Sequence, residues 1–404
     1  MNARHDTQRA PLIGRAAFAR MAMAGTDLTP LGQELLRRAA ATPEDANTLM
    51  DLSSLLLLNG NRSLSLQMQK QALDMEQIYR LPLRDEPVLR VLALMAPGDM
   101  MANTPIDFLL ENSDVELSLL FIGGDFPVPT QLPEHDLLFV AVGESEANLP
   151  LLHQLQDSLR NWPRPVLNSP ELIACLARDA VHARLHDAPG IALPRTLRTD
   201  RDTLERLATG ALAPTAILGD DFPLIVRPVD SHAGIGLERL ESPAAVAAYL
   251  AGASAHEFFI SRFVDYRSGD GLFRKYRIAL IGGKPYLAHL AISEHWMIHY
   301  LNAGMADSAD KRAEEAYAMQ RFELDFARRH RQALDAVYQR MGLDYLGIDC
   351  AETRDGELLI FEADTSMVIH DMDPADLYPY KQPQMRKVFA AFRELLLATA
   401  RPHR

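Results

Sequence analysis

LGIDCAETRDGELLIFEAD, residues 346–364, reads as two strands joined by a short turn. Side chains alternate between the faces of a strand, so Glu362 and Asp364 share one face, and the hairpin can bring Asp349 beside them. Asp349 and Glu362 lie inside apolar runs, where an unpaired carboxylate is costly to bury. Converging carboxylates repel one another unless a hard cation neutralises them, and oxygen ligands suit Mg²⁺. The segment predicts a magnesium site of Asp349, Glu362 and Asp364, with a solvated acidic edge as the alternative.

A glycine-containing loop lies in PLIVRPVDSHAGIGLERL, residues 223–240. A buried strand ends at Arg227, and the loop leads into another strand. Glycines let backbone N–H groups approach phosphate oxygens, and an arginine offers a two-pronged cationic donor. A plain hairpin turn is the alternative. We expect phosphates to contact Arg227, Ser231, His232, Gly234 and Gly236.

A third segment, FFISRFVDY at residues 258–266, is an apolar strand that runs into a turn. Its backbone could lie against an adenine ring, and backbone recognition of a base leaves little trace in a sequence. The residues expected at this hinge are Ser261, Arg262, Phe263 and Val264.

These three segments, in this order, resemble the ATP-grasp superfamily, particularly the branch with glutathione synthetase, D-alanine–D-alanine ligase and ribosomal-protein glutamate ligases. In that family a glycine loop covers the phosphates, and an Asp and a Glu-x-Asn on neighbouring strands bind two Mg²⁺ ions. The resemblance covers roughly residues 87–400. It implies ATP and Mg²⁺ as cofactors and a carboxylate–amine ligase that works through an acylphosphate. Arg277, ahead of a Gly-Gly-Lys turn, looks like the family's phosphate-contacting arginine, and with Arg227 it would stabilise the transferring phosphoryl group.

Four positions depart from the family pattern. Arg227 replaces a lysine, Ala180 stands where a nucleotide-binding lysine is usual, Arg262 replaces a hinge glutamate, and Asp364 replaces the asparagine. Arginine keeps the charge of lysine with a different geometry. Two alternatives to a ligase therefore stay open: a phosphotransferase of the same fold, and a nucleotide-binding scaffold without turnover.

The segment ISEHWMIHYLNAGMADSAD, residues 292–310, borders the acceptor site in the resembled enzymes. Substrate contacts are expected from His295, His299 and Asn302, with a purely structural role as the alternative. The two histidines are four residues apart, but no glutamate lies between them in a zinc-protease pattern.

The chain reads as three regions of mixed α+β and α/β class. Residues 1–84 have a purely helical pattern with one tetratricopeptide-like unit, a helical hairpin being the alternative. Residues 85–196 alternate strands and helices, as in a Rossmann-like domain that precedes an ATP-grasp fold. Residues 197–404 then form the ATP-grasp domain, including one long helix from 309 to 341.

The charge and cysteine content of the chain indicate which kinds of binding partner to expect. The 404 residues include 41 basic and 54 acidic side chains, a net charge of −13, which does not suit a nucleic-acid binder. No transmembrane helix is expected, and two distant cysteines without a CxxC pattern suggest a cytoplasmic protein. The expected partners are small-molecule or peptide carboxylates and amines, with a protein partner or a homodimer through the N-terminal helices.

Overall fold

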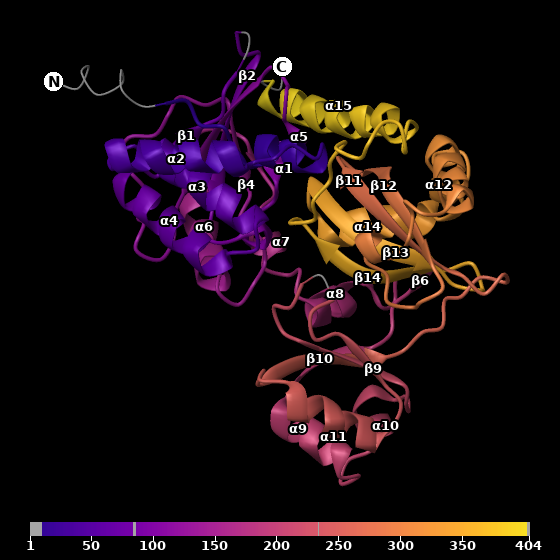
Figure 1. Ribbon diagram of the computed structural model, residues 1–404. Coiled ribbons are helices and arrows are strands. Elements are labelled where there is room, and N and C mark those ends of the chain that lie inside the picture. Colours follow the sequence, from indigo (N-terminus) through magenta and orange to yellow (C-terminus); the bar gives the residue numbers. More distant parts are fainter. Residues whose placement is uncertain (1–9, 84–85, 233, 402–404) are drawn as a thin grey trace. The chain divides into compact units, whose positions relative to one another are not determined.

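The computed structural model describes residues 10–83, 86–232 and 234–401. It divides the chain into two compact units (Figure 1). The first unit comprises Met1–Ala174, Leu343–Tyr345 and Thr365–Arg404, and the second comprises Cys175–Gly342 and Leu346–Asp364. The chain returns to the first unit after Asp364, which the expected domains 1–84, 85–196 and 197–404 do not include. Those three boundaries stay a prediction.

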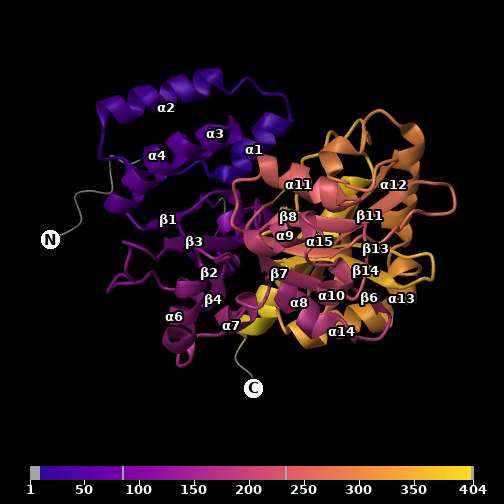
Figure 2. The same ribbon diagram turned by 90° about the horizontal axis from the view of Figure 1, so that it is seen from below.

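The first unit begins with four helices, in agreement with the helical pattern of the sequence. Asp45 and Asn61 cap the third and fourth helices by accepting hydrogen bonds from the backbone N–H groups of Thr48 and Leu64. The third and fourth helices pack side by side as a hairpin (Figure 2). A tetratricopeptide-like assignment is not confirmed. The helices are α1 Arg15–Met23, α2 Thr29–Ala41, α3 Ala46–Leu58 and α4 Arg62–Met75.

A five-stranded sheet with the order β1-β3-β2-β4-β5 forms the rest of this unit. Its four later strands are parallel and almost wholly buried, as continuous apolar runs predict, and β1 is antiparallel to β3. Phe392 of the C-terminal helix packs edge-on against Phe139 of β4. The strands are β1 Ile78–Arg80, β2 Leu89–Met95, β3 Val115–Phe121, β4 Leu137–Val140 and β5 Val166–Leu167, and the helices are α5 Ile106–Leu109, α6 Leu149–Leu159, α7 Pro170–Ile173 and α15 Lys381–Ala400.

Helix α1 is anchored by charged and polar contacts from distant parts of the sequence. Asp51 of α3 accepts hydrogen bonds from the backbone N–H groups of Ile13 at 2.9 Å and Gly14 at 3.0 Å. Arg20 donates to Glu111 and to Asp371, each at 2.6 Å. These contacts tie the N-terminal helices to α5 and to the segment that follows Asp364, so the helical region is part of the first unit's structure.

Burial raises the pKa of Asp51 to about 6, against about 4 for an exposed aspartate. Between these values the folded protein holds a proton that the unfolded chain has lost, so this group's contribution to stability falls as pH rises. A shift in pKa contributes roughly 1.4 kcal/mol per unit, spread over the range in which the group titrates. We therefore expect the free energy of unfolding of the wild type, relative to Asp51→Asn, to fall by about 2 kcal/mol between pH 4 and 6.5.

The measurement is denaturant unfolding in a Trp296→Phe background. Trp162 then reports on the first unit alone, because the chain has only two tryptophans. A difference between wild type and variant that stays constant with pH would contradict the assignment of a raised pKa.

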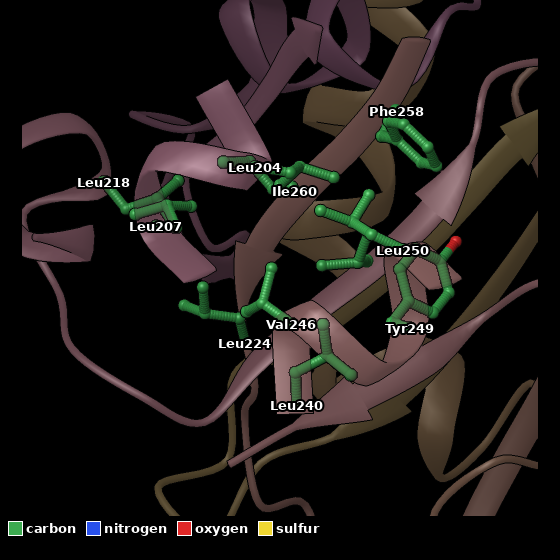
Figure 3. Close-up of a cluster of buried hydrophobic side chains, with 11 residues drawn as sticks. Leu204, Leu207, Leu218, Leu224, Leu240, Val246, Tyr249, Leu250, Phe258 and Ile260 are labelled. Atoms are coloured by element: carbon green, nitrogen blue, oxygen red, sulfur yellow. The ribbon is translucent and has the colours of Figure 1, made fainter. Parts of the chain in front are cut away.

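The second unit contains a four-stranded antiparallel sheet of order β7-β10-β8-β9. Helices α9 and α11 cover one face with an apolar core in which Leu204, Val246 and Leu250 approach Phe258 and Ile260 of β10 (Figure 3). This core fixes the strand β8 from which the glycine loop starts. The elements are β7 Thr196–Asp200, α9 Arg201–Ala208, α10 Pro214–Leu218, β8 Leu224–Pro228, β9 Glu238–Leu240, α11 Pro243–Gly252 and β10 Glu257–Arg262.

A five-stranded sheet of order β12-β11-β13-β14-β6 completes this unit. The predicted hairpins β11–β12 and β13–β14 are both antiparallel, and β6 pairs parallel to β14. Tyr276 of β11 packs on Phe326 of α13 with ring centroids 4.2 Å apart, so Lys275 and Arg277 point to the other face. The elements are α8 Arg178–Leu185, β6 Ile191–Ala192, β11 Phe273–Ile281, β12 Lys284–Ser293, β13 Tyr345–Glu352 and β14 Leu358–Asp364.

The single long helix expected from 309 to 341 is wrong. The segment forms α12 Ala309–Arg321, α13 Phe326–Arg329 and α14 Arg331–Met341. The helix is interrupted around Asp325, whose φ of −120° and ψ of −89° are not helical. The interruption lets Phe322 and Phe326 both turn into the core, where each is 4% exposed. Tertiary packing thus overrides the helix propensity of the sequence.

Among residues 10–83, 86–232 and 234–401, no helix combines the length and apolar character that a membrane crossing requires.

Candidate functional site

Strand β14 carries two carboxylates on one face, as the sequence predicts. Oxygen atoms of Glu362 and Asp364 and a ring nitrogen of His232 all lie within 4.8 Å of one another. His232 comes from the glycine loop between β8 and β9, so the two sheets of the second unit meet here. Two carboxylates and an imidazole are a donor set that fits a divalent cation.

Asp349 lies beside this group but has basic partners of its own. It is the cross-strand neighbour of Glu362. Its carboxylate accepts hydrogen bonds from Arg277 Nε at 2.8 Å and Nη2 at 3.0 Å, and from Lys275 Nζ at 3.0 Å. The sequence identified no basic partner for Asp349, and the structure shows that this carboxylate on β13 is paired with two basic side chains on β11. The group of side chains that could hold a cation contains His232, where the sequence interpretation placed Asp349.

Opposing effects set the pKa values of this pair. Burial would raise the pKa of Asp349, but the charges of Arg277 and Lys275 hold it well below its ordinary value. Burial would likewise lower the pKa of Arg277, and the charge of Asp349 raises it instead. Both groups are thus charged at neutral pH, and Asp349 is only 3% exposed.

Arg178 is a site residue that the sequence search missed. It is the first residue of α8, and its guanidinium contacts the Glu362 carboxylate and donates to the carbonyl oxygen of Phe361 at 2.7 Å. In the resembled family a nucleotide-binding lysine occupies the position of Ala180, two residues further along the same helix. Arg178 brings a positive charge to the site from the same helix, and a basic residue beside the missing lysine was the one available signal.

The glycine loop begins at a buried arginine. Arg227 is 8% exposed, and its Nε donates to Ser231 Oγ at 3.1 Å. Ser231 Oγ in turn donates to the carbonyl oxygen of Pro228 at 2.7 Å, which closes the turn. Gly236 has φ of 65°, and a Cβ there would lie 2.8 Å from the Pro228 ring, so only glycine fits. The loop is thereby held over the end of β8.

Positive charge exceeds negative charge around β14. Among the described residues, four basic side chains (Arg178, Arg227, Lys275 and Arg277) accompany three carboxylates (Asp349, Glu362 and Asp364). Burial, and then repulsion by Arg178, lowers the pKa of Arg227 to about 10. Burial would raise the pKa of Glu362, but Arg178 and Arg227 lower it. In a chain of net charge −13, this local excess of cations is the electrostatic property of an anion site.

The expected adenine hinge lies at the end of β10. The N–H of Phe263 already donates to the carbonyl oxygen of Pro223 at 2.9 Å. Arg262 pairs with Asp220 at 3.5 Å, so its side chain is directed to the protein surface. The Phe263 ring packs edge-on against Trp296 with centroids 5.7 Å apart. Ser261 and Val264 flank these residues and are partly buried.

Of the three expected substrate residues, His299 is the one whose pKa is affected by the charged side chains of the site. Burial, and then the charges of Lys275 and Arg277, lower the pKa of His299, so its imidazole is neutral at pH 7. Asn302 is exposed, and its side-chain oxygen accepts a hydrogen bond from the backbone N–H of His299 at 2.9 Å. His295 is also exposed, and its N–H donates to Ser293 Oγ at 3.1 Å.

Similarity of this chain to known proteins is found at the level of structure. No family model and no curated protein matches the chain. D-alanine–D-alanine ligase from Bacillus anthracis complexed with ATP is similar in structure, with a TM-score of 0.46 and 14% identity over 78% of this chain and 100% of its own. VanG D-Ala:D-Ser ligase from Enterococcus faecalis has a TM-score of 0.47 and 14% identity, over 78% and 100%.

A RimK domain protein ATP-grasp from Sphaerobacter thermophilus is also similar, with a TM-score of 0.42 and 15% identity over 76% of this chain and 99% of its own. These likenesses concern the fold alone. Likeness at this level does not define a reaction, because one fold hosts many activities. The function has to follow from the side chains of the site.

Proposed function

We propose that this protein is an ATP-dependent ligase of the ATP-grasp type, which joins a carboxylate to an amine through an acylphosphate. The observation that carries the proposal is the excess of buried positive charge around Glu362 and Asp364. Arg178 and Arg227 repel each other across the site, and a polyphosphate would relieve that repulsion. A neutral or cationic ligand would not be attracted electrostatically by these two arginines.

In this proposal the triphosphate lies under the glycine loop 230–236 and contacts Arg178 and Arg227. Glu362 and Asp364 hold the accompanying Mg²⁺, with Asp349 beside them. A bound divalent cation supplies neutralisation of phosphate charge and orients the phosphates. The adenine lies against residues 261–264, where backbone groups other than the Phe263 N–H contact the base.

The proposed reaction has two steps. An oxygen of the substrate carboxylate attacks the γ-phosphorus, a new C–O–P linkage forms, the bond to the β-phosphate oxygen breaks and ADP leaves. An amine nitrogen then attacks the acyl carbon, inorganic phosphate leaves with the former carboxylate oxygen, and the nitrogen loses a proton. In this proposal Arg277 and Lys275 stabilise charge on the transferring phosphoryl group, which is an electrostatic contribution.

His299 is suited to receive the proton of the amine. Its lowered pKa keeps the imidazole neutral and able to accept a proton at pH 7. We propose that it lines the acceptor site, with His295 and Asn302 supporting the segment that carries it. Both cysteines are free, and the reaction consumes ATP, so we propose a cytoplasmic location. The N-terminal helices remain the proposed surface for a protein partner or a second copy of the chain.

Hydroxylamine trapping tests the proposed reaction. Protein, Mg²⁺, ATP and a panel of amino acids and short peptides are incubated with hydroxylamine, which converts an acylphosphate into a hydroxamate. We expect ADP and hydroxamate to appear in equal amounts for at least one carboxylate, and Arg277→Gln to reduce both by about 100-fold or more.

Two other outcomes would point to the alternatives. ADP release that requires a hydroxyl compound, with a phosphorylated product and no hydroxamate, would identify a phosphotransferase. Nucleotide binding without ADP release under any acceptor would favour a scaffold. Either result would overturn the ligase proposal.

A further inference from the structure

The histidine of the glycine loop has a placement that a phosphate-binding role does not explain. His232 belongs to the loop between β8 and β9 of one sheet, whereas Glu362 and Asp364 belong to β14 of the other. Its ring nitrogen nevertheless lies within 4.8 Å of both carboxylates. Among the described parts of the chain, this is the group of three side chains brought together by the fold that could hold a metal ion. Phosphate oxygens attract cationic donors, whereas an imidazole nitrogen beside two carboxylate oxygens is a donor that suits a metal ion.

We propose that His232 coordinates the divalent cation that accompanies the nucleotide, and that the site therefore favours Mn²⁺ over Mg²⁺ more strongly than two carboxylates alone would. This inference rests on the proposed nucleotide site. It adds a nitrogen ligand, an ion preference and a contact between the two sheets.

His232 is close enough to the two carboxylates for this coordination after a local movement. Adjacent donors on an octahedral ion at about 2.1 Å lie about 3 Å from one another, and opposite donors about 4.2 Å. The three donor atoms lie within 4.8 Å of one another, so they have to draw together by up to about 2 Å, which side-chain rotation can supply.

The ligand chemistry selects the ion. Mg²⁺ takes oxygen ligands almost exclusively and keeps several waters, whereas Mn²⁺ and later divalent metals accept imidazole nitrogen more readily. The local excess of positive charge disfavours a bare cation, so the ion is expected to bind together with the triphosphate.

Coordination by His232 would tie the glycine loop to β14. The ion would then have ligands from both sheets of the second unit. The same residue would thus determine the preferred ion and link the two sheets.

The test uses the full-length protein, Mn²⁺ and a non-hydrolysable ATP analogue. Pulsed electron paramagnetic resonance detects the ¹⁴N coupling of an imidazole bound to Mn²⁺. We expect this coupling in the wild type and in His256→Asn, a control at an exposed position before β10, and its loss in His232→Asn. Calorimetry of the analogue with each ion should show the Mn²⁺-to-Mg²⁺ affinity ratio falling about 10-fold in His232→Asn only.

The outcomes separate this inference from the proposed function. Nucleotide binding with the same ion ratio in wild type and His232→Asn, and no ¹⁴N coupling in either, would overturn the role of His232 and leave the nucleotide site standing. Absence of nucleotide binding with both ions in the wild type would overturn the proposed function itself. Loss of the ¹⁴N signal with unchanged Mg²⁺-dependent binding in His232→Asn would support the inference.

Discussion

Replacement of Asp349 by asparagine is expected to lower the free energy of unfolding of the second unit by about 3 kcal/mol. Asp349 is 3% exposed and pairs with Arg277 and Lys275, whose side chains are 20% and 15% exposed. Asparagine is nearly isosteric but carries no charge, so two mostly buried cations would lose their counter-ion. Removal of one member of a buried ion pair costs far more than the pair contributes, because the remaining charge is desolvated.

Denaturant unfolding in a Trp162→Phe background measures this effect, because Trp296 then reports on the second unit. Asp355→Asn, on the exposed turn of the same hairpin, is the control and should change stability by less than about 0.5 kcal/mol. A carboxylate whose only role is to bind metal would repel Glu362 in the free protein. A variant Asp349→Asn that is more stable than the wild type would therefore contradict the pairing described here.

Replacement of Glu362 by glutamine is expected to remove most of the stabilisation by Mg-ATP. At a ligand concentration of about 100 times the dissociation constant, the wild type should gain about 2.7 kcal/mol. That gain corresponds to a rise of roughly 5–10 °C in the melting temperature for a unit of this size. Glutamine keeps the shape of glutamate but offers a neutral amide to the cation, so we expect a rise of less than about 2 °C.

Asp364→Asn provides the matched comparison. Asparagine occupies this position in the resembled family, and its side-chain oxygen remains a ligand for a hard cation. This variant should keep most of the stabilisation, although it loses a charge just as Glu362→Gln does. Equal stabilisation of the wild type and Glu362→Gln, or equal loss in both variants, would count against Glu362 as the specific ligand.

The strands and the face shared by Glu362 and Asp364 could be predicted from the sequence because both follow from local patterns. Apolar runs bounded by turns predicted β8, β10, β13 and β14, and the period of two placed the carboxylates. Local patterns also predicted that the N-terminal region is helical.

The partners of these residues could not be predicted in the same way. Arg178 reaches Glu362 across 184 positions of sequence, and Lys275 reaches Asp349 across 74. The sequence showed that a buried carboxylate needs a partner but not whether that partner is a metal or a basic side chain. The break near Asp325 lacks a glycine or proline signal, because it results from the packing of two phenylalanines.

A crystal structure of the protein with Mn²⁺ or Mg²⁺ and a non-hydrolysable ATP analogue tests the central claim most directly. We expect the triphosphate beneath the glycine loop within hydrogen-bond distance of Arg178 and Arg227, with the ion on oxygens of Glu362 and Asp364. An analogue bound elsewhere, with Arg178 still on Glu362 and no ion between Glu362 and Asp364, would contradict the assignment of this site to nucleotide binding.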